Sequence, residues 1–290
     1  MGDTTGISWT DSTMNFWEGC TKVGPGCDHC YAADRDIRWH GGSHWGAGAP
    51  RRQMSLHTRN NPMRWQRDAA AFRAEHGHPR RVFCSSLADI FDNEVDPAWQ
   101  VEAFATMAAT PDLRWQLCTK RVSNIAKMVP LRWINYGSPS DIISLTATWP
   151  RNVGILITTV TPEEVRRDVP RLVDLKRRFH IPWIGLSIEP MIEDVANALV
   201  DLGALLQDVD WIILGGESGP HARPCDLDWI LRALAVSKAR GCSVFVKQLG
   251  ADCRGLDGGR LILNDPAGKD RGEWPPGSAL HTFEFPESLR

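Results

Sequence analysis

The chain has 290 residues, of which 42% are hydrophobic and 23% are charged, so it can bury a sizeable core and is not a disordered, collagen-like or coiled-coil protein. Its 33 Lys and Arg residues and 35 Asp and Glu residues give a formal charge of -2, which argues against non-specific coating of nucleic acid and leaves room for a local basic cleft. No apolar run approaches the roughly 20 residues of a membrane span, and residues 1–10 lack a signal-peptide pattern. We therefore expect a cytoplasmic protein with no membrane partner.

Short apolar runs rich in Val, Ile, Leu or Trp recur along the chain and predict β-strands, and segments with helical spacing of apolar residues lie between them. The predicted strands are 81–84, 115–118, 153–158, 183–188, 211–214 and 243–246, with an N-terminal strand near 15–18. The predicted helices include 97–109, 162–179, 195–206 and 227–240. This alternation predicts an α/β fold in which parallel strands form a partial or full (βα) barrel.

Two segments interrupt the alternation. Residues 32–79 are rich in Gly, His and Arg and predict a loop-rich insertion after the first strand, where the five histidines are spaced too irregularly for a metal motif. Residues 251–290 are rich in Gly and Pro and predict a C-terminal segment that wraps over the main domain. Since we find no internal repeat, the simplest division is a single domain over residues 1–290.

Three cysteines carry the strongest chemical signal. Cys20, Cys27 and Cys30 lie on one stretch, with six and then two residues between them, and glycines on both sides of Pro25 supply turns that let the chain fold around a small object. Three thiolates can hold a [4Fe–4S] cluster with one iron left open for another ligand. Zinc with His29 or a distant cysteine as the fourth ligand, a disulfide and unliganded thiols are the alternatives.

The other cysteines give weaker signals. Cys84, Cys118 and Cys242 lie in or beside apolar strand runs, so we expect them to be buried thiols of the core. Cys225 and Cys253 carry no clear prediction.

The loop and four further motifs resemble known proteins. A three-cysteine loop after the first strand of a βα barrel is similar to the radical S-adenosylmethionine superfamily, although the usual spacing there is three and then two residues. A closer resemblance, to a phage-associated family of three-cysteine proteins, covers most of the chain. It rests on ISWT (7–10), WEGCTKVGPGCDHCY (17–31), SIEP (187–190), GGESGP (215–220) and VKQLG (246–250).

The superfamily resemblance implies a cofactor set and a position for it. Cys20, Cys27 and Cys30 would bind a [4Fe–4S] cluster whose open iron chelates S-adenosylmethionine, and an electron donor such as flavodoxin or ferredoxin would reduce it. Polar residues that follow the predicted strands would bind the rest of S-adenosylmethionine, because the carboxyl ends of parallel strands build the active site of a barrel. The candidates are Ser85, Ser86 and Asp89 for the amino group, Lys120 for the carboxylate, Thr158 for the ribose, and Ser187 and Glu189 for the ribose or adenine.

A second set of residues at the strand ends is a candidate for the substrate. The glycine-rich turn at 215–220 exposes backbone N–H groups that can bind an anion. Glu217 is a candidate base, and Lys247 should point into the site and pair with Glu217 or Glu189, because an unpaired buried ammonium is costly. The substrate-binding candidates are Arg121, Ser218, Arg223 and Gln248, and the two catalytic candidates are Glu217 and Lys247.

The resemblance to the phage-associated family implies DNA or a nucleotide as the substrate. The first expectation is an isomerase of DNA hypermodification that rearranges an amino-acid substituent on a modified thymine. The protein would then be located in the cytoplasm of the phage host. A radical S-adenosylmethionine lyase that repairs DNA lesions is the alternative. A zinc-stabilised binding protein without catalytic activity is the alternative from a different functional class.

Overall fold

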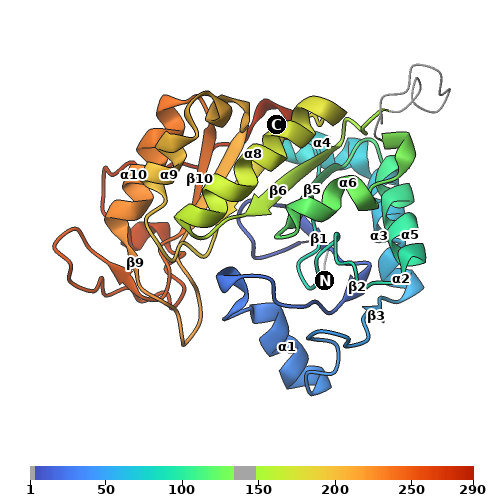
Figure 1. The fold of residues 1–290 in the computed structure, drawn as a ribbon, viewed down its shortest axis with the longest axis horizontal. Coiled ribbons are helices and arrows are strands. Elements are labelled where there is room, and N and C mark those ends of the chain that lie inside the picture. Colours follow the sequence, from blue (N-terminus) through green and yellow to red (C-terminus); the bar gives the residue numbers. More distant parts are fainter. Residues whose placement is uncertain (1–3, 134–147) are drawn as a thin grey trace.

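The computed structural model describes residues 4–133 and 148–290, and its centre is a sheet of seven parallel strands (Figure 1). In sheet order the strands are β1 (Ser12–Met14), β4 (Arg81–Cys84), β5 (Arg114–Thr119), β6 (Val153–Thr158), β7 (Ile184–Ile188), β8 (Trp211–Gly215) and β10 (Ser243–Gln248). This order follows the chain, as a βα barrel requires. Among the strands of the described residues, β1 pairs only with β4 and β10 only with β8, so the sheet is a partial barrel with one open side, which confirms the predicted fold class.

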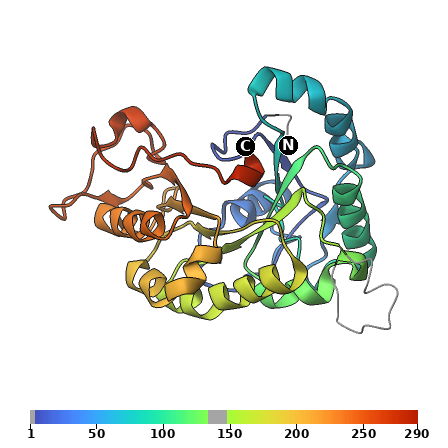
Figure 2. The ribbon, with the colours of Figure 1, turned by 90° about the horizontal axis from the view of Figure 1, so that it is seen from above.

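Most helices surround the outer side of the curled sheet (Figure 2), whereas α1 lies apart from it at one end of the molecule (Figure 1). The helices are α1 (Tyr31–His40), α2 (Leu56–Arg59), α3 (Asn61–Arg67), α4 (Ala69–His76), α5 (Pro97–Ala108), α6 (Ile125–Met128), α8 (Pro162–Phe179), α9 (Ala196–Asp201) and α10 (Leu227–Ala239). Two small sheets pair β2 (Trp17–Glu18) with β3 (Arg52–Gln53) and β9 (Cys225–Asp226) with β11 (Cys253–Arg254). None of the helices in the described ranges is long and apolar enough to cross a membrane.

Helix α8 illustrates how local sequence sets the outer layer. The Thr161 side chain accepts a hydrogen bond from the Glu164 N–H, Pro162 occupies the first turn, and His180 ends the helix in the left-handed conformation. Apolar residues at helical spacing turn one side of the helix to the sheet, and that side is buried. The buried apolar positions are Val165, Val169, Leu172, Val173, Leu175 and Phe179.

Alternate residues of most strands of the sheet enter two separate cores. In β8, Ile212 and Leu214 pack in the larger core under the helices, which we call the outer core. Ile213 packs in a smaller core on the inner side of the sheet, which we call the inner core. Val244 and Phe245 of β10 divide in the same way. Successive side chains of a strand point to opposite faces of the sheet, so every second residue points to the inner side. The last of these inward residues in each strand lies at the carboxyl end of the barrel.

The C-terminal segment fills the inner side at the amino ends of the strands. Phe283 forms an isolated bridge with Phe245 of β10, and the Trp211 indole N–H donates to the Glu284 carbonyl oxygen over 2.8 Å. On the other side of the opening, the Arg81 guanidinium donates to the Leu289 carbonyl oxygen over 2.9 Å. The tail thus spans the open side between β10 and β4, where pairing of β10 with β1 would close a full barrel.

The sheet begins earlier than predicted. The N-terminal strand of the sheet is β1 at Ser12–Met14 rather than 15–18, and the predicted residues overlap β2, which pairs antiparallel with β3 outside the sheet. The apolar run Phe16–Trp17 gave the stronger strand signal, but both side chains are buried core residues beside a short ladder. The insertion at 32–79 also holds most of α1 together with α2, α3 and α4 between its loops, because Ser55 and Pro62 start helices there.

A glycine in β6 makes room for an indole of the inner core, and this contact gives a stability prediction. A Cβ built on Gly154 would lie 1.9 Å from Cε2 of Trp183, a fully buried residue. We predict that Gly154→Ala lowers the free energy of unfolding by about 2 kcal/mol or more, because the core cannot accept the added methyl group without shifting. Urea unfolding measures the change.

Gly6→Ala is the matched control, since no atom lies within 4 Å of a Cβ at Gly6. It should change the free energy of unfolding by less than about 0.5 kcal/mol. Equal stability of Gly154→Ala and wild-type protein would contradict the packing described for the inner core.

Candidate active site

Two adjoining cavities lie at the carboxyl ends of the strands. The smaller, about 130 Å³, lies under the cysteine loop, which we define as residues 20–30, and Cys20, Cys27 and Cys30 all line it. The larger, about 530 Å³, lies on the inner side of the sheet and is called the central cavity below. Its volume is in the range of small-molecule sites. Ser86, Cys118 and Lys120 are among the residues that line both cavities, so the two spaces adjoin.

A buried carboxylate fixes the segment of chain that leads into the cysteine loop. Glu18, two residues before Cys20, is 2% exposed, and its Oε1 accepts a hydrogen bond from Nε of Arg52 over 2.7 Å. Its Oε2 accepts from Nη1 of Arg35 over 3.2 Å, and His40 Nε2 lies 3.2 Å from Oε1. Arg35 and His40 belong to α1, which begins directly after Cys30. Glu18 therefore ties the chain before the loop to the helix after it.

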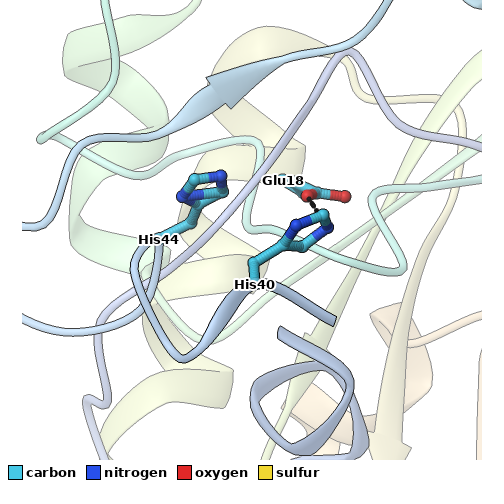
Figure 3. A group of neighbouring side chains, drawn as sticks. All are labelled: Glu18, His40 and His44. Atoms are coloured by element: carbon cyan, nitrogen blue, oxygen red, sulfur yellow. Dashed lines mark ion pairs between the residues drawn. The ribbon is translucent and has the colours of Figure 1, made fainter. Parts of the chain in front are cut away.

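Two of the five histidines of the insertion come together at Glu18. Figure 3 shows His40 and His44 beside the Glu18 carboxylate, with candidate ligand atoms of all three residues within 4.8 Å of one another. The two imidazole rings stack with centroids 5.3 Å apart. Two guanidinium groups already neutralise the carboxylate, however, and a divalent cation would have to displace them. We therefore interpret this cluster as an anchor for α1.

Two further arginines hold the first part of the loop. Arg51 is buried and donates to Oδ2 of Asp92 over 2.7 Å and to the Thr21 hydroxyl over 2.7 Å. Arg121 donates to the Thr21 carbonyl oxygen over 2.9 Å and to Sγ of Cys20 over 3.5 Å. Burial, with the Asp89 charge adding to it, raises the pKa of the Cys20 thiol to about 11, while the Arg121 hydrogen bond opposes the rise. The first thiol thus has a cationic partner at its sulfur.

The second part of the loop is fixed from the opposite side of the barrel. The Glu217 carboxylate, after β8, accepts from Nη2 of Arg223 over 2.6 Å and lies 3.0 Å from Nδ1 of His29. Arg223 also donates to the Pro25 carbonyl oxygen over 3.0 Å. Burial acts to raise the pKa of Glu217, but the hydrogen bonds from Arg223 and His29 outweigh it, so the pKa is lowered and the carboxylate stays charged.

The carboxyl group of Asp89 and the ammonium group of Lys120 both line the smaller cavity. Asp89 accepts hydrogen bonds from the Thr119 hydroxyl over 2.8 Å and the Lys120 N–H over 3.1 Å, and burial raises its pKa despite these partners and Arg121. Burial acts to lower the pKa of Lys120, but Cys27, Cys118, Cys30 and Asp89 outweigh it, so the pKa is raised. An ammonium therefore lies among the sulfur atoms.

Most of the residues predicted for the site line these two cavities. Ser85 and Asp89 line the smaller cavity, and Ser86, Lys120 and Thr158 line both. The other predicted residues of the central cavity are Ser187, Glu189, Glu217, Ser218, Lys247 and Gln248. Arg121 and Arg223 line neither cavity and point to the cysteine loop instead, although substrate contact was expected for both.

The pairing expected for Lys247 is present, with Glu189 as its partner. Lys247 lies on the inner face two residues after Phe245, and its ammonium reaches the carboxylate at the end of β7. The pair is largely buried, with 18% and 16% of the two side chains exposed. A buried ammonium thus has the counter-charge that its burial requires.

Cys118 packs against the core as its apolar strand predicted, but it also lines the site. Cys84 and Cys242 are buried as expected, but Cys118 lines both cavities together with the three loop cysteines. Its Sγ lies 3.5 Å from the Thr158 hydroxyl. Strand alternation offered a signal: Trp115 and Leu117 enter the outer core, so Gln116 and Cys118 point inward. None of the eight cysteines, all within the described ranges, forms a disulfide, so the pairing considered for the loop is absent.

Two other residues belong to the site without having been predicted. Tyr31 follows Cys30 and lines both cavities, and its hydroxyl donates to the Ser86 carbonyl oxygen over 2.5 Å. Trp9 lies at the apolar floor of the central cavity, against Phe83. In Gln248, a predicted residue, the amide N–H donates to Gly216 over 2.8 Å, while the buried Oε1 has no partner among the described residues. That unsatisfied acceptor is a place for a ligand donor.

The hydrogen bond from Arg223 to the Pro25 carbonyl oxygen of the cysteine loop gives a prediction that can be tested without a bound metal. We predict that Arg223→Ala raises the alkylation rate of Cys27 and Cys30 in the metal-free protein by about tenfold. A hydrogen bond to a charged group contributes on the order of 1.5 kcal/mol, and its loss raises the population of the open loop accordingly. Iodoacetamide labelling followed by mass spectrometry gives the rates.

Arg232→Ala is the control, because that side chain pairs with Asp194 and donates to Asn197, away from the loop. It should leave both rates unchanged. Unchanged rates in Arg223→Ala as well would show that Arg223 does not restrain the loop.

Comparisons with known proteins gave one family and several solved structures with low similarity. No curated protein matches the sequence. A structure of spore photoproduct lyase complexed with dinucleoside spore photoproduct has a TM-score of 0.42 and 13% identity, over 78% of this chain and 59% of that chain. A mutant of spore photoproduct lyase with bound AdoMet and the same dinucleoside has a TM-score of 0.42 and 13% identity, over 83% and 63%. The chain thus spans about three fifths of the length of these proteins.

The sequence itself matches one family profile over residues 4–261, most of its length. That family is described as a protein of unknown function, DUF5131. The profile covers the cysteine loop, all seven strands of the sheet and every predicted site residue. The chain belongs to the DUF5131 family.

Proposed function

We propose that this protein is a radical S-adenosylmethionine enzyme. The observation that carries the proposal is that three free thiols of one restrained loop line one cavity, which adjoins a larger cavity at the carboxyl ends of parallel strands. When bound to Cys20, Cys27 and Cys30, a [4Fe–4S] cluster would leave one iron open and supply the electron that cleaves S-adenosylmethionine to a carbon radical. The donor set fits such a cluster, because three thiolates from one loop bind three irons.

The side chains around the cluster position have separate tasks in this proposal. Asp89 and the Ser85 and Ser86 hydroxyls accept hydrogen bonds from the amino group of S-adenosylmethionine, and Lys120 pairs with its carboxylate. The Thr158 and Ser187 hydroxyls and Glu189 bind the ribose or adenine from the central cavity. Arg121 and Arg223 are positioning residues of the loop, and Glu217 acts with Arg223 in that role while it lines the central cavity.

The central cavity is the proposed substrate site. Its floor is apolar, at Trp9 and Phe83, and its rim holds Lys247, Gln248 and Ser218, so it can bury a planar base and hydrogen-bond a polar substituent. We propose a modified thymine of phage DNA, whose amino-acid substituent is rearranged by an isomerase reaction. A lyase that acts on damaged DNA would use the same cavity, so both kinds of DNA are substrates to test. Free thiols and an external electron donor such as flavodoxin or ferredoxin suit a reducing cytoplasm, that of the host if a phage encodes the protein.

One observation favours a second candidate. Cys118 lines the same cavity as the loop thiols and would supply the fourth ligand of a structural zinc site. The four thiols would first have to close together, because among the described residues the only group of three or more candidate ligands with atoms within 4.8 Å of one another is Glu18, His40 and His44. In this alternative the protein is a zinc-stabilised binding protein without radical chemistry. The two candidates differ in the need for Cys118, because a catalytic cluster requires three thiolates and a structural zinc site requires four ligands.

We predict that protein reconstituted anaerobically with iron and sulfide and reduced with dithionite forms 5′-deoxyadenosine from S-adenosylmethionine. Cys20→Ala, Cys27→Ala and Cys30→Ala should each lower this product at least about a hundredfold, because each removes a cluster ligand. Cys118→Ala is the matched cysteine control and should keep the iron content and the product. Chromatographic quantification of 5′-deoxyadenosine, with metal analysis of the same samples, gives both readouts.

Zinc in place of iron, with loss of the metal in Cys118→Ala, would favour the four-thiol structural site and contradict the enzyme proposal. Iron and sulfide bound without any 5′-deoxyadenosine would also contradict it. If the product forms, incubation with DNA carrying the modified thymine and, in parallel, with ultraviolet-damaged DNA separates the isomerase from the lyase.

A further inference from the structure

A third hollow continues from the central cavity onto the surface of α1. It measures about 460 Å³ and lies between α1 and the turn after β8. His29, Tyr31, Arg35 and Ser218 line both this groove and the central cavity. The groove is therefore an extension of the site rather than a separate pocket.

Helix α1 presents large side chains to this surface instead of burying them. Only Ala32 and Asp36 of the helix are buried, whereas Tyr31 and Trp39, which line the groove, are 58% and 66% exposed. Figure 1 shows the helix standing apart from the sheet and the outer helices. An exposed tryptophan beside an active-site opening is a common place for contact with a ligand, because its hydration is unfavourable.

The charges along the groove leave a cation free. Asp28 is paired with Lys22 and Arg223, and Arg35 with Glu18. In the described part of the chain, Arg38 has no carboxylate within ion-pair distance, and its guanidinium lies 5.3 Å from the centre of the Trp39 ring. Among the acidic residues that line the groove, Asp34 has no basic partner within ion-pair distance in the described part of the chain. The imidazoles of His29 and His221 lie on the other wall of the groove.

We propose that this groove binds a single strand of nucleic acid next to the nucleotide that enters the central cavity, with a base stacked on Trp39 and a phosphate on Arg38. The inference rests on the proposed function and deepens it, because it assigns residues outside the central cavity to the strand that flanks the reacting nucleotide. An aromatic ring and an adjacent guanidinium are the pair of groups that single strands need, one for the base and one for the backbone. A free nucleotide would need the central cavity alone.

The test is a binding measurement that needs no turnover. Fluorescence anisotropy with a labelled single-stranded oligothymidylate should give roughly tenfold weaker binding for Trp39→Ala, since stacking of one base accounts for such a change. Arg38→Ala should weaken binding and reduce its dependence on salt, because one phosphate contact is lost. Binding of thymidine monophosphate should be the same in both variants and in wild type.

Val101→Ala and Arg151→Ala are the matched controls. Val101 is 66% exposed on α5, and Arg151 is an exposed residue that precedes β6, at the opposite ends of the strands from the groove. Neither substitution should change oligonucleotide binding. Circular dichroism of every variant establishes that it is folded.

Oligonucleotide binding that is unchanged in Trp39→Ala and Arg38→Ala would overturn the proposal, and so would the absence of oligonucleotide binding by the wild type. Tighter binding of a duplex than of the single strand, with no effect of either substitution, would overturn it as well. Iron content and 5′-deoxyadenosine formation, measured on the same proteins, separate this failure from failure of the proposed enzyme, because neither depends on the groove.

Discussion

Arginine hydrogen bonds and ion pairs around buried carboxylates hold the cysteine loop over the barrel opening, and the arrangement of the three thiols depends on them. A loop with several glycines has many conformations in solution, so a shape that directs three sulfur atoms into one cavity must be stabilised from outside the loop. Glu18 ties its two ends together, Arg51 and Arg121 hold its first part, and Glu217 with Arg223 holds its second part. The partners come from β2, β3, the end of β5 and the turn after β8, so the loop is positioned by the whole barrel.

Removal of one partner of a fully buried pair such as Arg51–Asp92 leaves an uncompensated charge and costs about 3–5 kcal/mol. Such pairs add less to stability than apolar packing does, but they set geometry, because each requires a specific orientation. The sheet supplies the stability. Its outer face packs under the helices, and its inner face packs aromatic side chains of the tail at the amino ends of the strands. The polar inward residues Cys118, Thr158, Ser187 and Lys247 are therefore left at the carboxyl ends, around the central cavity.

Much of this architecture follows from the sequence. The predicted bounds of β4, β6 and α8 agree with the structure, because each is a continuous apolar or amphipathic run with a clear start and stop. β1 was missed because three residues with one apolar side chain give no strand signal, and its place is set by pairing with β4. Helices α2 and α3 were missed because they are short and rich in polar residues.

The candidate site also has features that the sequence predicts and features that it does not. Position at a strand end predicted most of the cavity-lining residues, since parallel strands bring those ends together. The directions of long side chains were not predictable: Arg121 and Arg223 turn to carbonyl oxygens and carboxylates of the loop, which lie far from them in the sequence. Cys118 was assigned to the core because its strand is apolar, and only the division of β5 between two faces reveals that its thiol points to the cavity.

The proposed activity requires a redox-active cluster at the loop with a coordination position for S-adenosylmethionine. The most direct test is the electron paramagnetic resonance spectrum of reconstituted, dithionite-reduced protein, recorded with and without S-adenosylmethionine. We predict a signal from a reduced [4Fe–4S] cluster whose line shape changes when S-adenosylmethionine is added. A spectrum that the addition does not alter, or a protein that retains zinc and takes up no iron, would contradict it.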